Sequence, residues 1–274
     1  MNCLRIPDLV KKKQQGEKLT MLTAYDYLFA KLLDEAGIDI LLVGDSVGMV
    51  LLGYETTLPV TLEMMIHHSQ AVSRGAQRAF VIADMPFLSY QVSISEAVRN
   101  AGRLIQEGGV SAVKIEGGKV MADVVHRLVD VGIPVMGHLG LLPQSVHQLG
   151  GFRIQAKNQE DVERLLEDAK ILEEAGAFSI VLESIPANVA LQVTSQLSIP
   201  TIGIGAGPHC DGQVLVSHDV FGLSQDNTPN FVKQYAQLGT ELKKAVAAYV
   251  ADVQAGNFPS KEHFFDGEIK ANSK

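Results

Sequence analysis

The feature that most constrains this chain is an alternation between short apolar segments and longer amphipathic ones. Each apolar segment is too short for a helix and lacks strict polar alternation, which is typical of strands buried on both faces of a parallel sheet. The segments occupy residues 19–23, 38–44, 79–83, 112–115, 134–137, 178–182, 200–204 and 214–216. Repeated β and α segments predict parallel strands joined by right-handed crossovers.

The amphipathic segments carry helix start and stop signals. Ser93 and Glu96 form a capping-box pattern, and Gly108 is expected to end that helix. Asn158 is expected to cap a later helix that Gly176 ends. A last helix, ended by Gly256, is predicted from regularly spaced apolar residues. These are Phe231, Tyr235, Leu238, Leu242, Tyr249, Val250 and Val253.

Eight candidate strands predict an α/β protein folded as a closed (β/α)8 TIM barrel. The alternative is a doubly wound open sheet, but no Gly-x-Gly-x-x-Gly pattern follows the first strand to support its dinucleotide-binding form. We expect residues 1–265 to form a single barrel domain. The polar residues 266–274 are expected to be a mobile tail.

Charge and composition argue against several partners. The net charge is −8 and the longest basic run is Lys11-Lys12-Lys13, which argues against nucleic acid. No apolar run approaches the ~18 residues that span a bilayer, and the first residues lack the apolar core of a signal peptide. Cys3 and Cys210 are expected to be free thiols in a reducing compartment. We therefore expect a cytoplasmic protein without nucleic-acid or membrane partners.

Polar residues end five of the predicted strands, at the edge where barrels of this kind hold their active sites. They are Asp45 and Ser46, Asp84, Lys114 and Glu116, His138, and Glu183. Lys114 and Glu116 are two residues apart on one strand, so both face the same way. A single residue of this kind would mean little, but five strands delivering ionisable groups to one mouth predict a site.

Each candidate also has an ordinary structural alternative. Asp45, Asp84 and Glu183 could cap turns or helices. Lys114 and Glu116 could form a structural ion pair. His138 could be a core histidine whose ring nitrogens are satisfied by neighbours.

Two aspartates and a glutamate, without a His or Cys pair at ligand spacing, make an oxygen-only site of the kind that Mg²⁺ prefers. A lysine in the same mouth can neutralise a substrate carboxylate. A free glutamate can remove a proton next to a carbonyl while the metal stabilises the enolate. The residues thus predict a Mg²⁺-assisted enolisation or retro-aldol enzyme that acts on a small keto acid.

Three long connections, residues 45–60, 85–92 and 139–157, are expected to be lids and walls of the site. The glycine-rich residues 203–212 could cradle a phosphate. A tight turn that keeps the barrel mouth open is the preferred interpretation, because no basic residue follows them.

Several long motifs resemble the ketopantoate hydroxymethyltransferase family, from about residue 19 to about residue 265. They are LTAYD (22–26), VGDSVGMVLLGYETTLPVT (43–61), ADMPFLSY (83–90), AVKIEGG (112–118), GHLGLLPQSVHQLGGFRIQAK (137–157), LES-x-P (182–186) and TIGIGAGPHCDGQVLV (201–216). One departure is Ala156, where the family pattern has glycine.

The resemblance implies transfer of a hydroxymethyl group from 5,10-methylenetetrahydrofolate to 3-methyl-2-oxobutanoate, giving 2-dehydropantoate in pantothenate biosynthesis. It implies Asp45 and Asp84 as Mg²⁺ ligands, with Glu116 as the third acidic residue of the metal site. It also implies a homodecamer in the cytoplasm and kinship with the phosphoenolpyruvate/pyruvate barrels.

The resemblance assigns the remaining candidates to the substrate and the proton. It implies that Ser46 and Lys114 hold the keto acid, that His138 contacts it, and that Glu183 accepts the proton.

Two alternatives remain, a related enzyme of the same superfamily and a protein of another class. The first is a carbon–carbon lyase or decarboxylase of a small 2-keto acid on the same barrel, but the Lys-Lys-Cys-Gly-His string of such lyases is absent. The second is a non-catalytic scaffold, which a complete set of site residues argues against.

Overall fold

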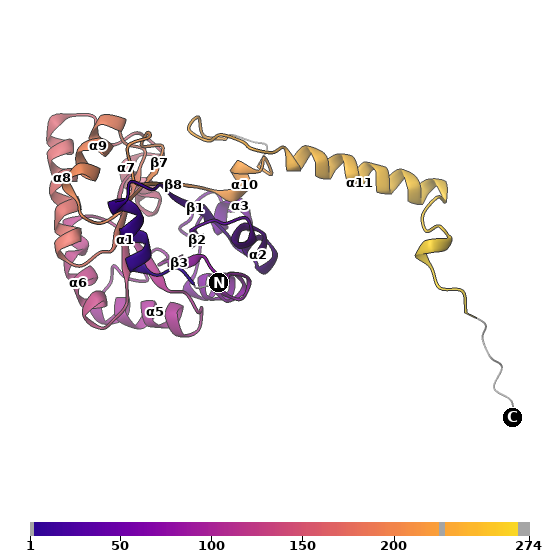
Figure 1. Cartoon of the computed structure of the whole chain (residues 1–274), viewed down its shortest axis with the longest axis horizontal. Helices are drawn as coiled ribbons and strands as arrows, with labels where there is room; N and C mark the ends of the chain where they lie inside the picture. Colours follow the sequence, from indigo (N-terminus) through magenta and orange to yellow (C-terminus); the bar gives the residue numbers. More distant parts are fainter. Residues whose placement is uncertain (1–2, 225–227, 268–274) are drawn as a thin grey trace, which may run out of the picture. The chain divides into compact units, whose positions relative to one another are not determined.

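The predicted strands close into one parallel barrel in a computed structural model of the chain (Figure 1). Each strand pairs with the next, and β8 pairs with β1. The strands are β1 Leu19–Thr23, β2 Ile40–Val43, β3 Phe80–Asp84, β4 Ala112–Glu116, β5 Val135–Gly140, β6 Ser179–Glu183, β7 Thr201–Ile204 and β8 Gly212–Leu215. Each overlaps the apolar segment that predicted it, so the (β/α)8 barrel is confirmed and the open sheet is excluded.

The structure describes residues 3–224 and 228–267. The chain divides into a barrel unit, which runs to Ser217 and includes Asn230–Val232, and a second unit made of His218–Pro229 and the residues from Lys233 on. A single domain over residues 1–265 stays a prediction. Of the predicted tail, residues 266 and 267 are exposed, and residues 268–274 lie outside the described residues.

Helices alternate with the strands, and Figure 1 shows α5, α6 and α8 outside them. The helices are α1 Ile6–Gln14, α2 Tyr27–Glu35, α3 Val47–Val50, α4 Leu62–Gly75, α5 Ile94–Gln106, α6 Ala122–Asp130, α7 Val146–Leu149, α8 Gln159–Glu174, α9 Ala187–Gln196, α10 Ser217–Val220 and α11 Leu238–Ala255, with 3-10 turns η1 Lys119–Met121, η2 Pro143–Ser145 and η3 Lys261–His263. The predicted caps are present: Ser93 accepts from the Glu96 amide, and Asn158 accepts from the Asp161 amide.

Apolar side chains fill the inside of the barrel below its carboxyl end. Met21, Ile40 and Phe80 belong to one buried cluster that spans most of the strands. Leu9 of α1 joins the same cluster, so α1 closes the amino-terminal end of the barrel. We call that end the floor and the carboxyl end of the strands the mouth.

Charged residues of the floor are paired. Asp39, just before β2, contacts Lys12 Nζ at 2.9 Å and Arg78 Nη2 at 2.8 Å. Its second oxygen accepts from the Thr20 amide and hydroxyl at 3.1 and 3.0 Å. Asp211, just before β8, contacts Lys13 Nζ at 2.9 Å. These contacts tie α1 to the strands that begin there.

The second unit contains α11, whose residues are exposed apart from Gly239. The predicted last helix was too long at its start, because α11 begins at Leu238 and Phe231 and Tyr235 precede it. Gly256 ends it with a φ of 73°, as expected for a left-handed helix end. Leu242, Val246, Tyr249, Val250 and Val253 make an exposed apolar stripe at helical spacing.

None of the helices in residues 3–224 and 228–267 combines the length and apolar character that crossing a membrane requires.

Candidate active site

The structure brings the predicted site residues together at the mouth. Asp45 follows β2 after one glycine, Asp84 and Glu183 end β3 and β6, and His138 lies in β5. Asp84 is paired in register with Lys114, and Glu116 with His138. Because neighbouring parallel strands end at the same rim, side chains far apart in sequence become neighbours.

Asp45 and Asp84 form a buried acidic pair. The Asp45 amide donates to Asp84 Oδ2 at 3.0 Å, and both side chains are almost fully buried. A Cβ on Gly44 would lie 2.6 Å from Ser46 Oγ, so glycine leaves room for the Ser46 hydroxyl in its present position. Burial, and then the charges of Asp84 and Glu116, raise the pKa of the Asp45 carboxyl well above its usual value.

Lys114 is the ammonium group among these carboxylates. Its Nζ lies 2.8 Å from Asp84 Oδ1 and 3.2 Å from His138 Nδ1. Burial alone would lower the pKa of Lys114, but Asp84, Glu116 and Asp45 together raise it above its usual value. Lys114 is therefore held in its charged form.

His138 links the two glutamates. Its Nδ1 lies 3.4 Å from Glu116 Oε1, and its Nε2 lies 3.1 Å from Glu183 Oε2. Burial and Lys114 lower the pKa of His138, but Glu116 and Glu183 outweigh them and raise it to about 8. The pKa of Glu116 is lowered, because contacts with His138, Lys114 and the Gln144 amide outweigh its burial. The ring can thus orient Glu183 and carry a proton beside it.

The site residues differ in how far they are exposed to solvent. Asp45, Asp84, Lys114, Glu116 and His138 are buried, whereas the Glu183 side chain is 15% exposed. Ser46 is also partly exposed, and its Oγ lies 2.8 Å from the Tyr25 hydroxyl. A small molecule that enters the mouth therefore meets Ser46 and Glu183 before it reaches the buried charges.

The donor set fits a hard cation. Four carboxylates lie around one lysine and one histidine, and the contact of Asp84 Oδ1 with Lys114 Nζ at 2.8 Å balances one of these charges. No group of three or more His, Cys, Asp or Glu residues in that part of the chain has the geometry of a complete metal site. Mg²⁺ typically takes only one or two protein carboxylates and keeps water ligands, so Asp45 and Asp84 fit it without a third direct ligand.

The sequence analysis missed three residues of the site: Tyr25, Tyr90 and Gln144. Tyr90 OH and Gln91 Nε2 donate to Gln144 Oε1, and Gln144 Nε2 donates to Asp45 Oδ2. Tyr90 OH also accepts from the Glu116 amide at 3.0 Å. The only earlier signal for them was their place in the motifs LTAYD, ADMPFLSY and GHLGLLPQS.

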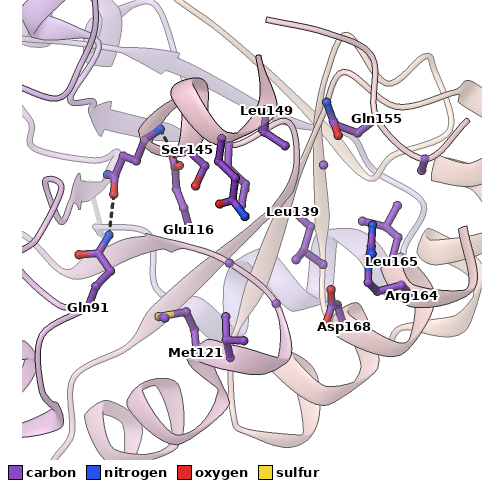
Figure 2. A pocket seen from close by; sticks show the side chains of 18 of the residues that line it. Gln91, Glu116, Met121, Leu139, Ser145, Leu149, Gln155, Arg164, Leu165 and Asp168 are labelled. Atoms are coloured by element: carbon purple, nitrogen blue, oxygen red, sulfur yellow. Dashed lines mark hydrogen bonds between the residues drawn. The ribbon is translucent and has the colours of Figure 1, made fainter. Parts of the chain in front are cut away.

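A cavity of about 460 Å³ lies beside the site (Figure 2). Figure 2 shows Gln91 and Glu116 toward one side of it and Arg164, Leu165 and Asp168 toward the other. Glu116 is the member of the predicted site among its lining residues, together with Tyr90 and Gln144. The long connection of residues 139–157 also lines it, which agrees with the expectation that this segment forms a wall.

Residues 203–212 make a tight turn. Gly205 and Gly207 have φ of 61° and 78°. A Cβ on Gly205 would lie 2.9 Å from the Phe231 ring, and one on Gly207 would lie 2.4 Å from the Ala187 Cβ. Their glycines are thus explained by conformation and close packing, which favours the turn over a phosphate cradle.

Solved structures of low sequence identity share this fold. 2,3-Dimethylmalate lyase, of the PEP mutase/isocitrate lyase superfamily, superposes with a TM-score of 0.57 at 20% identity, over 91% of this chain and 98% of that one. A phosphonopyruvate hydrolase crystallised with oxalate and Mg²⁺ superposes with a TM-score of 0.60 at 13% identity, over 94% of this chain and 92% of that one.

Sequence relatives are much closer. The 3-methyl-2-oxobutanoate hydroxymethyltransferase of Syntrophus aciditrophicus is 59% identical over 253 residues, 92% of this chain and 93% of that protein. The enzyme of the same name from Thermoanaerobacter sp. (strain X514) is 56% identical over 264 residues, 96% of each protein. The family model of ketopantoate hydroxymethyltransferase matches residues 4–261. The chain therefore belongs to the ketopantoate hydroxymethyltransferase family.

Proposed function

We propose that this enzyme transfers a hydroxymethyl group to 3-methyl-2-oxobutanoate, giving 2-dehydropantoate, with 5,10-methylenetetrahydrofolate as the donor. The observation that carries the proposal is the buried cluster at the mouth, in which one ammonium and one imidazole lie among four carboxylates. A cluster of this composition suits a small anionic keto acid together with a divalent cation.

In the proposed site, Asp45 and Asp84 hold Mg²⁺, and Glu116 completes the acidic shell, directly or through water. When bound, the ion supplies Lewis-acid polarisation of the substrate carbonyl. The excess of carboxylates over cations supports this assignment: burial, and then the charges of Asp84 and Glu116, raise the pKa of Asp45, and a bound cation would offset that penalty.

Lys114 and Ser46 are proposed to hold the keto acid. The Lys114 ammonium would face the substrate carboxylate, because burial strengthens that attraction. Ser46 is oriented by the Tyr25 hydroxyl, so its own proton or lone pair points in a fixed direction. His138 would contact the substrate from β5, next to the strand of Lys114, while it positions Glu183.

Glu183 is proposed as the base. It removes the proton from C3, and the electrons of that C–H bond form the C2–C3 double bond while the carbonyl oxygen gains negative charge. Water releases the methylene carbon of the donor as formaldehyde and leaves tetrahydrofolate. C3 then attacks that carbon, and the formaldehyde oxygen takes up the proton and becomes the new hydroxyl group. The exposed fraction of Glu183 and its 3.1 Å contact with His138 support this role.

Proton removal tests the proposal without the folate. The enzyme with Mg²⁺ and 3-methyl-2-oxobutanoate in D₂O should exchange the C3 proton, which proton NMR follows directly. Absence of exchange above the enzyme-free rate would refute the proposed chemistry. Addition of the donor should then give 2-dehydropantoate.

We further propose a cytoplasmic homodecamer in which residues 1–265 act as one domain. The exposed apolar stripe of α11 supports a protein partner, and a second copy of the chain is the simplest one. Sedimentation at micromolar concentration should give an assembly far larger than a dimer.

A further inference from the structure

Gln144 occupies an unusual position between the 139–157 connection and the site. It lies in η2, and it is 5% exposed. Its side-chain nitrogen donates to Asp45 Oδ2 and to the Met85 carbonyl, each at 2.9 Å. Its backbone amide donates to Glu116 Oε2 at 3.0 Å. One residue of a loop therefore contacts two carboxylates that come from different strands.

The orientation of the Gln144 amide is fixed from the other side. Tyr90 OH donates to Gln144 Oε1 at 2.8 Å, and Gln91 Nε2 donates to the same oxygen at 3.1 Å. A flipped amide would turn its oxygen toward Asp45 and lose both of these bonds. Tyr90 keeps its proton, because burial and then Glu116 raise its pKa well above the usual value. The nitrogen of Gln144 is thus aimed at Asp45.

These bonds occupy one oxygen of each carboxylate. Gln144 donates to Asp45 Oδ2 and Glu116 Oε2, so these bonds do not use Asp45 Oδ1 or Glu116 Oε1, and Glu116 Oε1 lies 3.4 Å from His138 Nδ1. A carboxylate that is held at one oxygen loses little further freedom when it binds a cation with the other.

We propose that Gln144 is a positioning residue that aims Asp45 and Glu116 at the divalent cation, so that metal affinity depends on how the 139–157 connection is seated. This inference rests on the proposed function, because it assumes that these two carboxylates serve a cation. Gln144 lines the cavity of Figure 2 together with Ser145 and Leu149, so the segment that carries it faces open space on that side.

The test uses Gln144→Met, which keeps the length of the side chain and removes both polar atoms. Mn²⁺ replaces Mg²⁺ as the probe, since it prefers the same oxygen ligands and its binding is followed by electron paramagnetic resonance. The apparent Kd for Mn²⁺ should rise about 10- to 100-fold, the usual effect of removing a group that orients a metal ligand. Saturating metal should restore most of the C3–H exchange rate, because Glu183 is untouched.

Gln148→Leu is the matched control. Gln148 comes from the same connection and lines the cavity, and no bond from it to Asp45 or Glu116 is present in the described structure. Its Kd for Mn²⁺ should equal that of the wild type. Gln144→Asn is the second variant if Gln144→Met does not fold; it keeps the amide but is one methylene too short to reach Asp45, so the same loss is expected.

The outcomes separate the two proposals. Wild-type Mn²⁺ affinity in a folded Gln144→Met or Gln144→Asn protein would overturn the positioning role alone. A loss of exchange that no metal concentration restores would also overturn it, since the variant would then have damaged the site in another way. A wild-type enzyme that binds no Mn²⁺ and exchanges no proton would overturn the proposed function and this inference together.

Discussion

The two ends of the barrel use the same kinds of residue in opposite ways. At the floor, Asp39 is met by Lys12, Arg78 and Thr20, and these contacts lower its pKa despite its burial. At the mouth, Asp45 is buried beside Asp84 and Glu116, and its pKa is raised. Because a lowered carboxylate pKa stabilises the folded state at neutral pH and a raised one destabilises it, the floor contributes stability and the mouth reduces it.

Barrel enzymes are expected to divide their ends in this way, with chemistry at the carboxyl end and stability at the other. In this chain Asp39 at the floor and Asp45 at the mouth show this division, because their pKa values shift in opposite directions.

Asp45→Asn should abolish turnover, because the variant loses one of the two proposed metal carboxylates. Its thermal stability should equal or exceed that of the wild type, because the amide removes repulsion with Asp84 and Glu116. Turnover assays and calorimetry measure the two effects on one sample. A variant that is active after treatment with EDTA would contradict the metal assignment, and a large loss of stability would contradict the comparison.

Glu183→Gln should slow C3–H exchange by about 10²–10⁴, the usual contribution of a positioned general base. Mn²⁺ binding should be preserved, since Glu183 is not a proposed ligand. Glu107→Gln, an exposed glutamate paired with Arg103, serves as the control and should exchange at the wild-type rate. Unchanged exchange in Glu183→Gln would move the base to another residue, and His138 would be tested next.

Asp39→Asn should lower the free energy of unfolding by about 2–3 kcal/mol, because two cations lose their carboxylate while the amide keeps part of the hydrogen bonding. Both cations are about a quarter exposed, which keeps the estimate below that for a fully buried pair. Folded Asp39→Asn should keep wild-type kcat. A defect in kcat at normal stability would show that the floor also serves the chemistry.

The loss of stability in Asp39→Asn should depend on pH. The folded pKa of Asp39 lies below its unfolded value of about 3.9, so its stabilisation is present above that value and is lost as pH falls through the folded pKa. Denaturant curves of the wild type and Asp39→Asn should therefore differ at pH 7 and converge below about pH 3. A difference that stays constant with pH would assign the effect to packing.

Lys114→Met should raise KM for the keto acid about 10- to 150-fold, because the substrate carboxylate loses a charged hydrogen bond worth about 1.5–3 kcal/mol. Methionine keeps most of the buried stem, and circular dichroism checks folding. Lys119→Met, an exposed lysine paired with Glu167, should leave KM unchanged. An unaltered KM in folded Lys114→Met would exclude this role.

Ala156→Gly should stabilise the protein by about 1 kcal/mol. Ala156 has a φ of 52°, a left-handed conformation that costs alanine about 1–2 kcal/mol. The gain should appear in denaturant melts with kcat unchanged. No gain would mean that the greater freedom of glycine in the unfolded chain offsets the relief.

The parts of the molecule that depend on periodicity could be predicted from the sequence. Strand positions follow from apolar runs, and Asp84 and Glu183 lie at the mouth because they end such runs. Tyr25, Tyr90 and Gln144 could not be predicted as neighbours of the site, because the paths of the loops that carry them follow no repeat.

Ion pairs between residues far apart in the sequence could not be predicted either. Asp39 meets Lys12 and Arg78 only after the barrel closes, and nothing in their local sequence marks them as partners. The start of α11 was misplaced because Phe231 and Tyr235 share its apolar spacing without belonging to the helix.

The layering inside the barrel has a consequence for engineering. The ionisable residues of the site lie in or just after the carboxyl-terminal halves of their strands, and the buried apolar cluster of the barrel contains no ionisable residue. The site residues at the mouth are thus separate from the apolar core that supports the barrel. Substitutions of these site residues by other short side chains with oxygen atoms leave the apolar core unchanged. Variants with new chemistry at the mouth can therefore be tested without first stabilising the barrel.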